Sequence, residues 1–172
     1  MPPDYHNEKR QFSAVVEAHY KPLYRFAFSL AKSQHEACDL TQETFAIYAR
    51  KVGSIKDVTK TKSWLFTTLY REFLRTRRRD KNTTPTEHEI LEAQAPSVDP
   101  GLTNRIDSQT ALDALNELEE SFRIPLTLFY LEHLSYKEIS ETLDIPIGTV
   151  MSRLSRAKAQ LKQILGNSKV EN

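Results

Sequence analysis

Cysteine and glycine are scarce in this chain of 172 residues, which contains one cysteine and four glycines. A single cysteine, Cys38, cannot form an internal disulfide and excludes a zinc site built only from cysteines. Tight hairpins and β-barrels use glycine freely, so its scarcity disfavours an all-β fold. His35 precedes Cys38 by three residues, which leaves a redox or metal role open. A buried, inert thiol is the interpretation that a lone cysteine favours.

Long apolar runs and enzyme motifs are also absent from the sequence. The longest apolar run, from Ile124 to Leu131, is far too short to cross a bilayer, and the N-terminus lacks the apolar segment of a signal peptide. There is no glycine-rich phosphate loop and no G-x-S-x-G motif, and the histidines lack the spacing of metal ligands. We therefore expect a cytoplasmic protein with no membrane insertion, no cofactor, no metal and no catalytic residues.

Charge is unevenly distributed, although the net charge is only +1. Residues 1–81 carry 16 basic and 9 acidic side chains, residues 82–145 carry 3 and 13, and residues 146–172 carry 5 and 1. Two basic blocks separated by an acidic stretch suggest two surfaces that face a polyanion. Taken alone, the charge pattern also fits ordinary solvated helix faces.

Apolar residues recur with helical spacing in the first half of the chain. The spacing predicts helices over residues 12–31, 34–51 and about 62–79, with Pro22 kinking the first helix or starting a new one. Residues 82–106 contain three prolines among polar residues and have no regular period. A structureless stretch of this length indicates a linker between two domains. We therefore expect domains over 1–81 and 107–165, followed by a tail over 166–172.

The second half begins with two apolar stripes at helical spacing. The second of these starts with Ile124, Leu128 and Leu131. Ser135 and Glu138 then form the pattern of a capping box, which opens a short helix. Pro146 suits the start of the last helix, which is predicted over about 148–165. The chain is therefore predicted to be all-α, in two small helical domains.

Two short helices joined by a tight turn, the second of them basic, describe a helix-turn-helix. One face of the second helix is predicted to bind duplex DNA through hydroxyl groups and cations: Thr149, Ser152, Arg153, Arg156 and Lys158. Arginine can bind guanine edges bidentately, whereas lysine and hydroxyl groups can hold phosphates. The alternative is a plain amphipathic helix whose cations complement its C-terminal dipole.

Three segments together resemble a known family. The segment LSYKEISETLDIPIGTVMSRLSRAKAQL is similar to region 4 of the extracytoplasmic-function (ECF) sigma factors of bacterial RNA polymerase. Upstream, YRFAFSLAKSQHEACDLTQETFAIYAR resembles regions 2.1–2.2, and TKSWLFTTLYREFLRTRRR resembles regions 2.3–2.4. The resemblance covers about residues 11–80 and 107–165. It implies a sigma factor that binds core RNA polymerase and directs it to promoter DNA, while catalysis belongs to the polymerase.

The resemblance assigns the second helix to core polymerase. The residues that match the family's polymerase-binding helix here are Asp39, Gln42, Glu43 and Phe45. Asp39 and Glu43 are i, i+4 neighbours and share one helix face. Phe45 points elsewhere and is open to a core role, and the acidic face could also be simply solvated.

The third helix and the loop before it would, by resemblance, bind the melted minus-ten element. That chemistry needs cations for phosphates and an aromatic group or a pocket for a flipped base, which we place in the loop over 53–60. Trp64 could equally be a core residue. The candidate residues are Asp57, Lys60, Lys62, Trp64, Arg71, Arg75 and Arg78.

The recognition helix would, by the same resemblance, read the minus-thirty-five element as duplex. The acidic linker would thread toward the polymerase channel in imitation of a nucleic acid, or act as a simple tether. An anti-sigma factor is a further expected partner. Two other functions stay open from sequence: a stand-alone helix-turn-helix regulator, and a sigma mimic that captures an anti-sigma factor.

Overall fold

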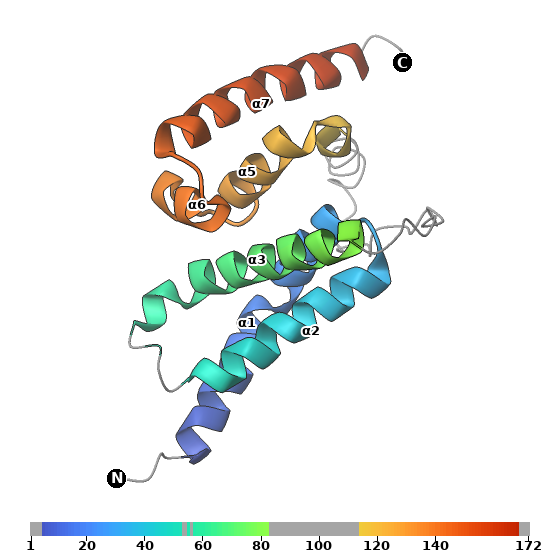
Figure 1. Ribbon diagram of the computed structural model, residues 1–172. Coiled ribbons are helices and arrows are strands. Elements are labelled where there is room, and N and C mark those ends of the chain that lie inside the picture. Colours follow the sequence, from blue (N-terminus) through green and yellow to red (C-terminus); the bar gives the residue numbers. More distant parts are fainter. Residues whose placement is uncertain (1–4, 53–54, 56, 83–113, 169–172) are drawn as a thin grey trace, which may run out of the picture. The chain divides into compact units, whose positions relative to one another are not determined.

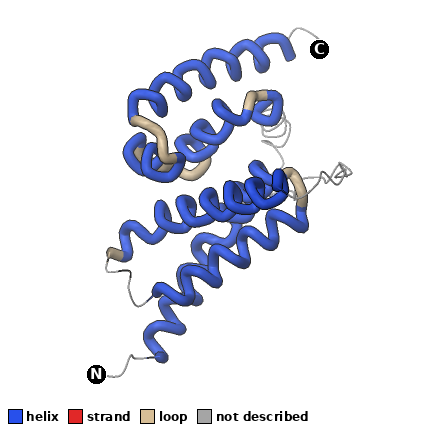
Figure 2. The backbone as a smooth tube through the Cα atoms, in the orientation of Figure 1, coloured by secondary structure: helices blue, strands red, loops and turns tan. Residues whose placement is uncertain are grey.

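The computed structural model describes residues 5–52, 55, 57–82 and 114–168. All regular structure in these residues is helical, which confirms the predicted fold class (Figure 2). The chain divides into two compact units, residues 1–93 and 94–172, and the division falls inside the predicted linker. Residues 83–113, which include nearly all of that linker, lie outside the described residues, as does the end of the predicted tail.

Unit 1 is a bundle of three long helices that pack against one another (Figure 1). They are α1 (Tyr5–Ala31), α2 (Gln34–Lys51) and α3 (Thr61–Asn82), and a 3-10 turn, η2 (Val58–Lys60), leads into α3. Their shared core contains apolar side chains that are essentially inaccessible to solvent: Leu23, Phe26, Leu30, Tyr48, Leu65, Phe66 and Leu69. The rings of Phe26 and Phe66 meet across α1 and α3 with centroids 5.4 Å apart.

Helix α2 buries hydroxyl groups as well as apolar side chains. Thr41 and Thr44 are fully buried, and their hydroxyl groups donate to the carbonyls of Ala37 and Leu40 at 2.7 Å. This bond to the preceding turn removes the cost of burying an unpaired hydroxyl. Threonine can therefore occupy the apolar stripe that the sequence pattern predicts.

Helix α1 contains a proline and ends where the sequence predicts, at Ala31. Helix α1 continues through Pro22, so the proline does not start a new helix. It ends before Lys32, whose backbone is left-handed with φ of 56°. Asp144, the C-cap of α6, also adopts positive φ in a position that favours glycine, and His133 does so in the loop after α5. A chain with few glycines thus ends its helices with other residues.

In the described part of unit 2, residues 114–117 are helical, and α5 (Glu120–Tyr130), α6 (Tyr136–Leu143) and α7 (Ile147–Ser168) follow. Helix α7 packs against both α5 and α6. The core joins Leu126 and Leu128 of α5 to Ile139 of α6 and Val150 of α7, all almost completely buried. Leu131, which the periodicity places on the buried stripe of α5, is 44% exposed. That prediction was wrong because α5 ends at Tyr130, so Leu131 no longer follows the helical stripe.

The predicted capping box of α6 is confirmed. The hydroxyl of Ser135 accepts from the backbone N–H of Glu138 at 3.2 Å, and the Glu138 carboxylate accepts from the N–H of Ser135 at 2.8 Å. At the other end, the Ser140 hydroxyl donates to the carbonyl of Ile145 at 2.6 Å. The Pro146 carbonyl then accepts the first bonds of α7. Side-chain and backbone bonds therefore fix both ends of the turn between α6 and α7.

Replacing Ser135 with alanine is expected to lower the free energy of unfolding of unit 2 by about 1 kcal/mol, the usual value of a lost N-cap. Urea denaturation of the full chain, followed by circular dichroism, measures the change. The control is Ser155→Ala, which removes an exposed hydroxyl from the interior of α7 and should change stability little. Equal effects of the two substitutions would contradict a capping role for Ser135.

Candidate functional site

Only one side of helix α7 packs against the rest of unit 2. Val150, Leu154 and Ala157 are at most 3% exposed and face the core of unit 2. The opposite side carries a stripe at i, i+3, i+4 and i+7 that is exposed along its length: Gly148, Met151, Ser152 and Ser155. The helix thus presents a free outer surface of mostly small side chains, the shape that a groove of duplex DNA can accept.

The residues predicted to bind duplex DNA do not all share that outer surface. Ser152 and Arg156 are exposed, whereas Thr149 and Arg153 lie at the edge of the core and are half-buried. The Ser152 hydroxyl donates to the Thr149 carbonyl at 3.0 Å, which leaves its lone pairs available to a partner. Of the two arginines, Arg156 is therefore the more accessible.

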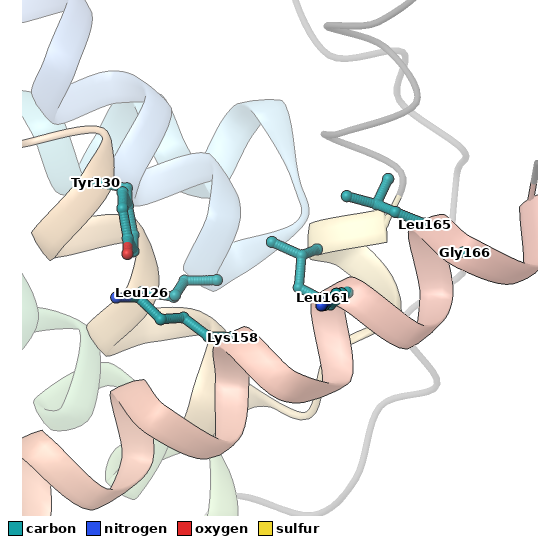
Figure 3. A pocket seen from close by; sticks show the side chains of 7 residues that line it. Leu126, Tyr130, Lys158, Leu161, Leu165 and Gly166 are labelled. Atoms are coloured by element: carbon teal, nitrogen blue, oxygen red, sulfur yellow. The ribbon is translucent and has the colours of Figure 1, made fainter.

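Lys158 is also exposed, but it projects from a different side of α7 than Arg156 and lies in line with Met151, seven residues earlier. Figure 3 shows its side chain reaching toward Tyr130 of α5, and the Lys158 ammonium lies 5.3 Å from the centre of the Tyr130 ring. The neighbouring Tyr130 hydroxyl raises the pKa of Lys158. A step of two residues turns the helix by about 200°, which carries Lys158 away from the face of Arg156.

Met151 and Ser155 also belong to the outer surface of α7, although neither was among the residues predicted to bind DNA. Placing the outer face opposite the buried stripe of Val150, Leu154 and Ala157 would have found both residues.

The predicted polymerase-binding face of α2 is accessible. Asp39 and Gln42 are exposed, and Glu43 is half-buried. Asp39 lies 3.4 Å from the Nε2 atom of His35, and Glu43 lies 3.3 Å from a guanidinium nitrogen of Arg50. Ion pairs between exposed side chains contribute little to stability, so a partner can replace them at low cost.

Phe45 lies in the core and not on that face. Its side chain is 6% exposed, and its ring stacks on Tyr20 of α1 with centroids 6.3 Å apart. Since the predicted contact between Phe45 and a partner requires an accessible ring, the structure corrects it to a packing role. Phe45 fixes α2 against α1 and thereby orients the acidic face.

The segment that leads into α3 is ordered by a carboxylate. Asp57 accepts from the backbone N–H of Thr59 at 3.0 Å and from its hydroxyl at 2.5 Å. These bonds, the hydroxyl bond first, hold the pKa of Asp57 below its usual range. Lys60 is exposed and Lys62 half-buried, whereas Gly53, Ser54 and Lys56 of the predicted base pocket lie outside the described residues.

Trp64 is half-buried and contacts the ring of Tyr48, with centroids 6.0 Å apart at 56°. One side of the indole packs while another stays accessible, so both roles considered for it remain compatible with its position. Further along α3, residues 75–80 are all exposed. Arg71 and Arg78 are exposed, and Arg75 lies 2.8 Å from Glu72. The last turns of α3 therefore form a cationic surface.

No cluster of three or more potential metal ligands occurs among the described residues, and Cys38 is a half-buried free thiol. Within the same part of the chain, no helix combines the length and the apolar character that a membrane crossing requires.

Two protein-family models match the chain: sigma-70 region 2 over residues 15–83 and sigma-70 region 4 over residues 108–161. An ECF RNA polymerase sigma factor, SigE of Mycolicibacterium smegmatis, is 34% identical over 164 residues, covering 91% of this chain and 62% of the relative. The chain belongs to the ECF sigma factors. Another relative, SigM of Bacillus subtilis, is 29% identical over 87% of this chain and 92% of its own length.

Solved structures agree with this sigma-factor assignment. The sigma factor RpoE of Bartonella quintana, solved in complex with the anti-sigma factor NepR, has a TM-score of 0.73 and 28% identity, covering 91% of this chain and 98% of that one. CnrH, solved with the cytosolic domain of CnrY, shares the fold, with a TM-score of 0.63 and 19% identity over 92% and 90% of the two chains. Sigma factors direct RNA polymerase to promoters and are not enzymes, so this sigma factor acts in transcription initiation.

Replacing Thr59 with valine is expected to raise the pKa of Asp57 toward its ordinary value, because the hydroxyl bond is the largest cause of the low pKa. The pKa of Asp57 is lower in the folded chain than its ordinary value. The charged carboxylate therefore stabilises this turn at pH values above the ordinary pKa, and that stabilisation is lost as the pH falls through the lowered pKa. NMR titration of the Asp57 carboxyl carbon measures the shift. Thr59→Ser keeps the hydroxyl and should keep the low pKa; a return to the ordinary value in that variant as well would rule out the hydroxyl as its cause.

Proposed function

We propose that this chain binds core RNA polymerase through unit 1 and reads a two-part promoter with both units. The observation that carries the proposal is that region 2 and region 4 of the sigma-70 family occur together in one chain. A stand-alone regulator would need only the second of them. No catalytic step is assigned to the chain itself, and its place of action is that of the polymerase, the cytoplasm.

Polymerase binding is assigned to the exposed face of α2. Asp39, Gln42 and Glu43 are the proposed contacts, and Phe45 supports them from the core. Glu43 lies beside the Arg50 guanidinium and Asp39 beside the His35 imidazole, so both carboxylates are placed where nitrogen donors reach them. A basic helical surface on the polymerase is the complementary partner.

Binding of the opened minus-ten strand is assigned to η2 and α3. Lys60, Lys62 and the arginines of α3 supply cations for phosphates, and the accessible side of Trp64 offers a surface on which a base can stack. Asp57 caps the turn η2, which leads into α3. Its second proposed role is a polar contact to a flipped base.

Binding of the duplex minus-thirty-five element is assigned to α7, through Thr149, Ser152, Arg153 and Arg156. An anti-sigma factor is the proposed regulator, because the similar sigma factor of Bartonella quintana was solved bound to one.

Size-exclusion chromatography of the full chain with sigma-free core polymerase, followed by promoter-specific transcription, tests the proposal. Co-elution that a primary sigma factor competes away, together with specific transcripts, is expected. Co-elution without transcripts would favour a sigma mimic. Duplex binding by the chain alone, without co-elution, would favour a stand-alone regulator.

Reversing two charges on α2 is expected to weaken polymerase binding at least about tenfold, because like charges would then meet at the interface. The variant is Asp39→Arg with Glu43→Arg, and the dissociation constant for core polymerase is measured by fluorescence anisotropy. The control, Glu8→Arg with Glu17→Arg, makes the same charge change on α1 and should bind as the unmodified chain does. Equal loss in both variants would indicate a general charge effect and remove the α2 face from the interface.

Replacing Arg156 or Arg153 with alanine is expected to reduce discrimination between upstream elements by about 1–3 kcal/mol if the guanidinium contacts a base. Competition binding of the holoenzyme to matched and mismatched duplexes measures it. A loss that is equal on all sequences would assign the residue to phosphate. Lys158→Ala is the matched control, and a loss of discrimination as large as that of Arg156→Ala would contradict the separate placement of Lys158.

A further inference from the structure

The outer surface of α7 contains an apolar side chain that the packing of unit 2 does not use. Met151 is 53% exposed, although the neighbouring positions on the same helix, Val150 and Leu154, are buried. Ile147, one turn earlier, is 49% exposed, so the two form a short apolar strip. Single exposed hydrophobic residues are common, so exposure by itself does not assign a role.

The neighbouring glycine supplies a second observation. Gly148 is exposed, has no positive φ, and would meet no atom within 4 Å if it carried a Cβ. Nothing in the folded chain therefore requires glycine there, and glycine has a lower helix propensity than alanine. A flat position beside a protruding thioether is useful when another molecule must approach the helix backbone closely.

The polar residues around this strip favour duplex DNA as that molecule. Ser152 and Ser155 share the outer stripe with Gly148 and Met151, and Arg156 borders it. Hydroxyl groups and a guanidinium suit phosphates and base edges, whereas a protein-binding apolar patch would be expected to have a wider apolar surface. In the major groove, the apolar group available to such a side chain is the C5 methyl of thymine.

We propose that Met151 reads the methyl group of a thymine in the upstream promoter element, and that Gly148 is where the duplex comes closest to α7. This inference rests on the proposed function of α7 as the helix that reads duplex DNA. It adds a specificity-determining residue that acts through apolar contact, beside the hydrogen-bonding residues already assigned.

Deoxyuridine offers a direct test, because it pairs like thymidine and lacks only the methyl group. Holoenzyme made with the full chain first selects its preferred upstream element from a duplex library randomised there. Each thymine of that element is then replaced singly by deoxyuridine, and binding is measured for the unmodified chain, Met151→Ala and Met151→Leu. At one thymine, or two adjacent ones, the replacement should weaken binding by the unmodified chain about fourfold, the effect of one buried methyl group.

Met151→Ala should bind thymine and deoxyuridine equally at that position, whereas Met151→Leu should keep the preference. A lost contact with the methyl group makes the affinities for thymine and deoxyuridine equal. A general weakening of DNA binding lowers both affinities and leaves their ratio unchanged. An unchanged ratio in Met151→Ala, or weaker polymerase binding with intact sequence preference, would overturn the inference. If the unmodified holoenzyme selects no upstream element, the proposed function of α7 fails instead.

Substitutions at two glycines of α7 test whether the duplex comes closest to the helix at Gly148. Gly166, like Gly148, would meet no atom within 4 Å if given a Cβ, but it lies near the far end of the helix. Both Gly148→Ala and Gly166→Ala should raise the urea midpoint of unfolding. Only Gly148→Ala should weaken duplex binding by the holoenzyme, and equal affinity in the two variants would contradict close approach at Gly148.

Discussion

A helix that reads DNA has to be held firmly from one side while its other side stays free. In unit 2 that constraint is met by three side chains, Val150, Leu154 and Ala157, which anchor α7 in the core. Helices α5 and α6 both pack against α7, and the capping box fixes the residue at which α6 begins. Any gain in burial on the outer side of α7 would remove the surface that we propose contacts the promoter.

In unit 1, helix α2 likewise has one side buried in the core and another side exposed. Its buried side combines Ala37 and Leu40 with threonines whose hydroxyl groups bond to the helix itself, so a polar residue costs the core little. Its exposed side carries carboxylates held only by weak surface ion pairs. The bundle thus keeps an acidic face whose surface ion pairs can be replaced at low cost, which suits the proposed role of this face in binding polymerase.

Helical periodicity was enough to predict the helices of both units, the capping box at Ser135 and the all-α class, because each depends on local spacing. The errors arose where local spacing meets a tertiary contact or a helix end. Leu131 follows the stripe but comes after the last turn of α5, and Lys158 has the right charge but points to Tyr130. Helical spacing left Phe45 open between a partner contact and the core, and its packing against α1 places it in the core. The outer surface of α7 could have been derived from sequence by working outward from the buried residues.

The turn between α6 and α7 has a consequence for the thermodynamics of binding. Asp144 is fixed in the left-handed region, Pro146 has a φ restricted by its ring, and the Ser140 hydroxyl is bonded to the carbonyl of the residue between them. A segment so restricted has little conformational entropy left to lose when the two helices meet a duplex. The ordering that a looser turn would require at the promoter has already taken place during folding.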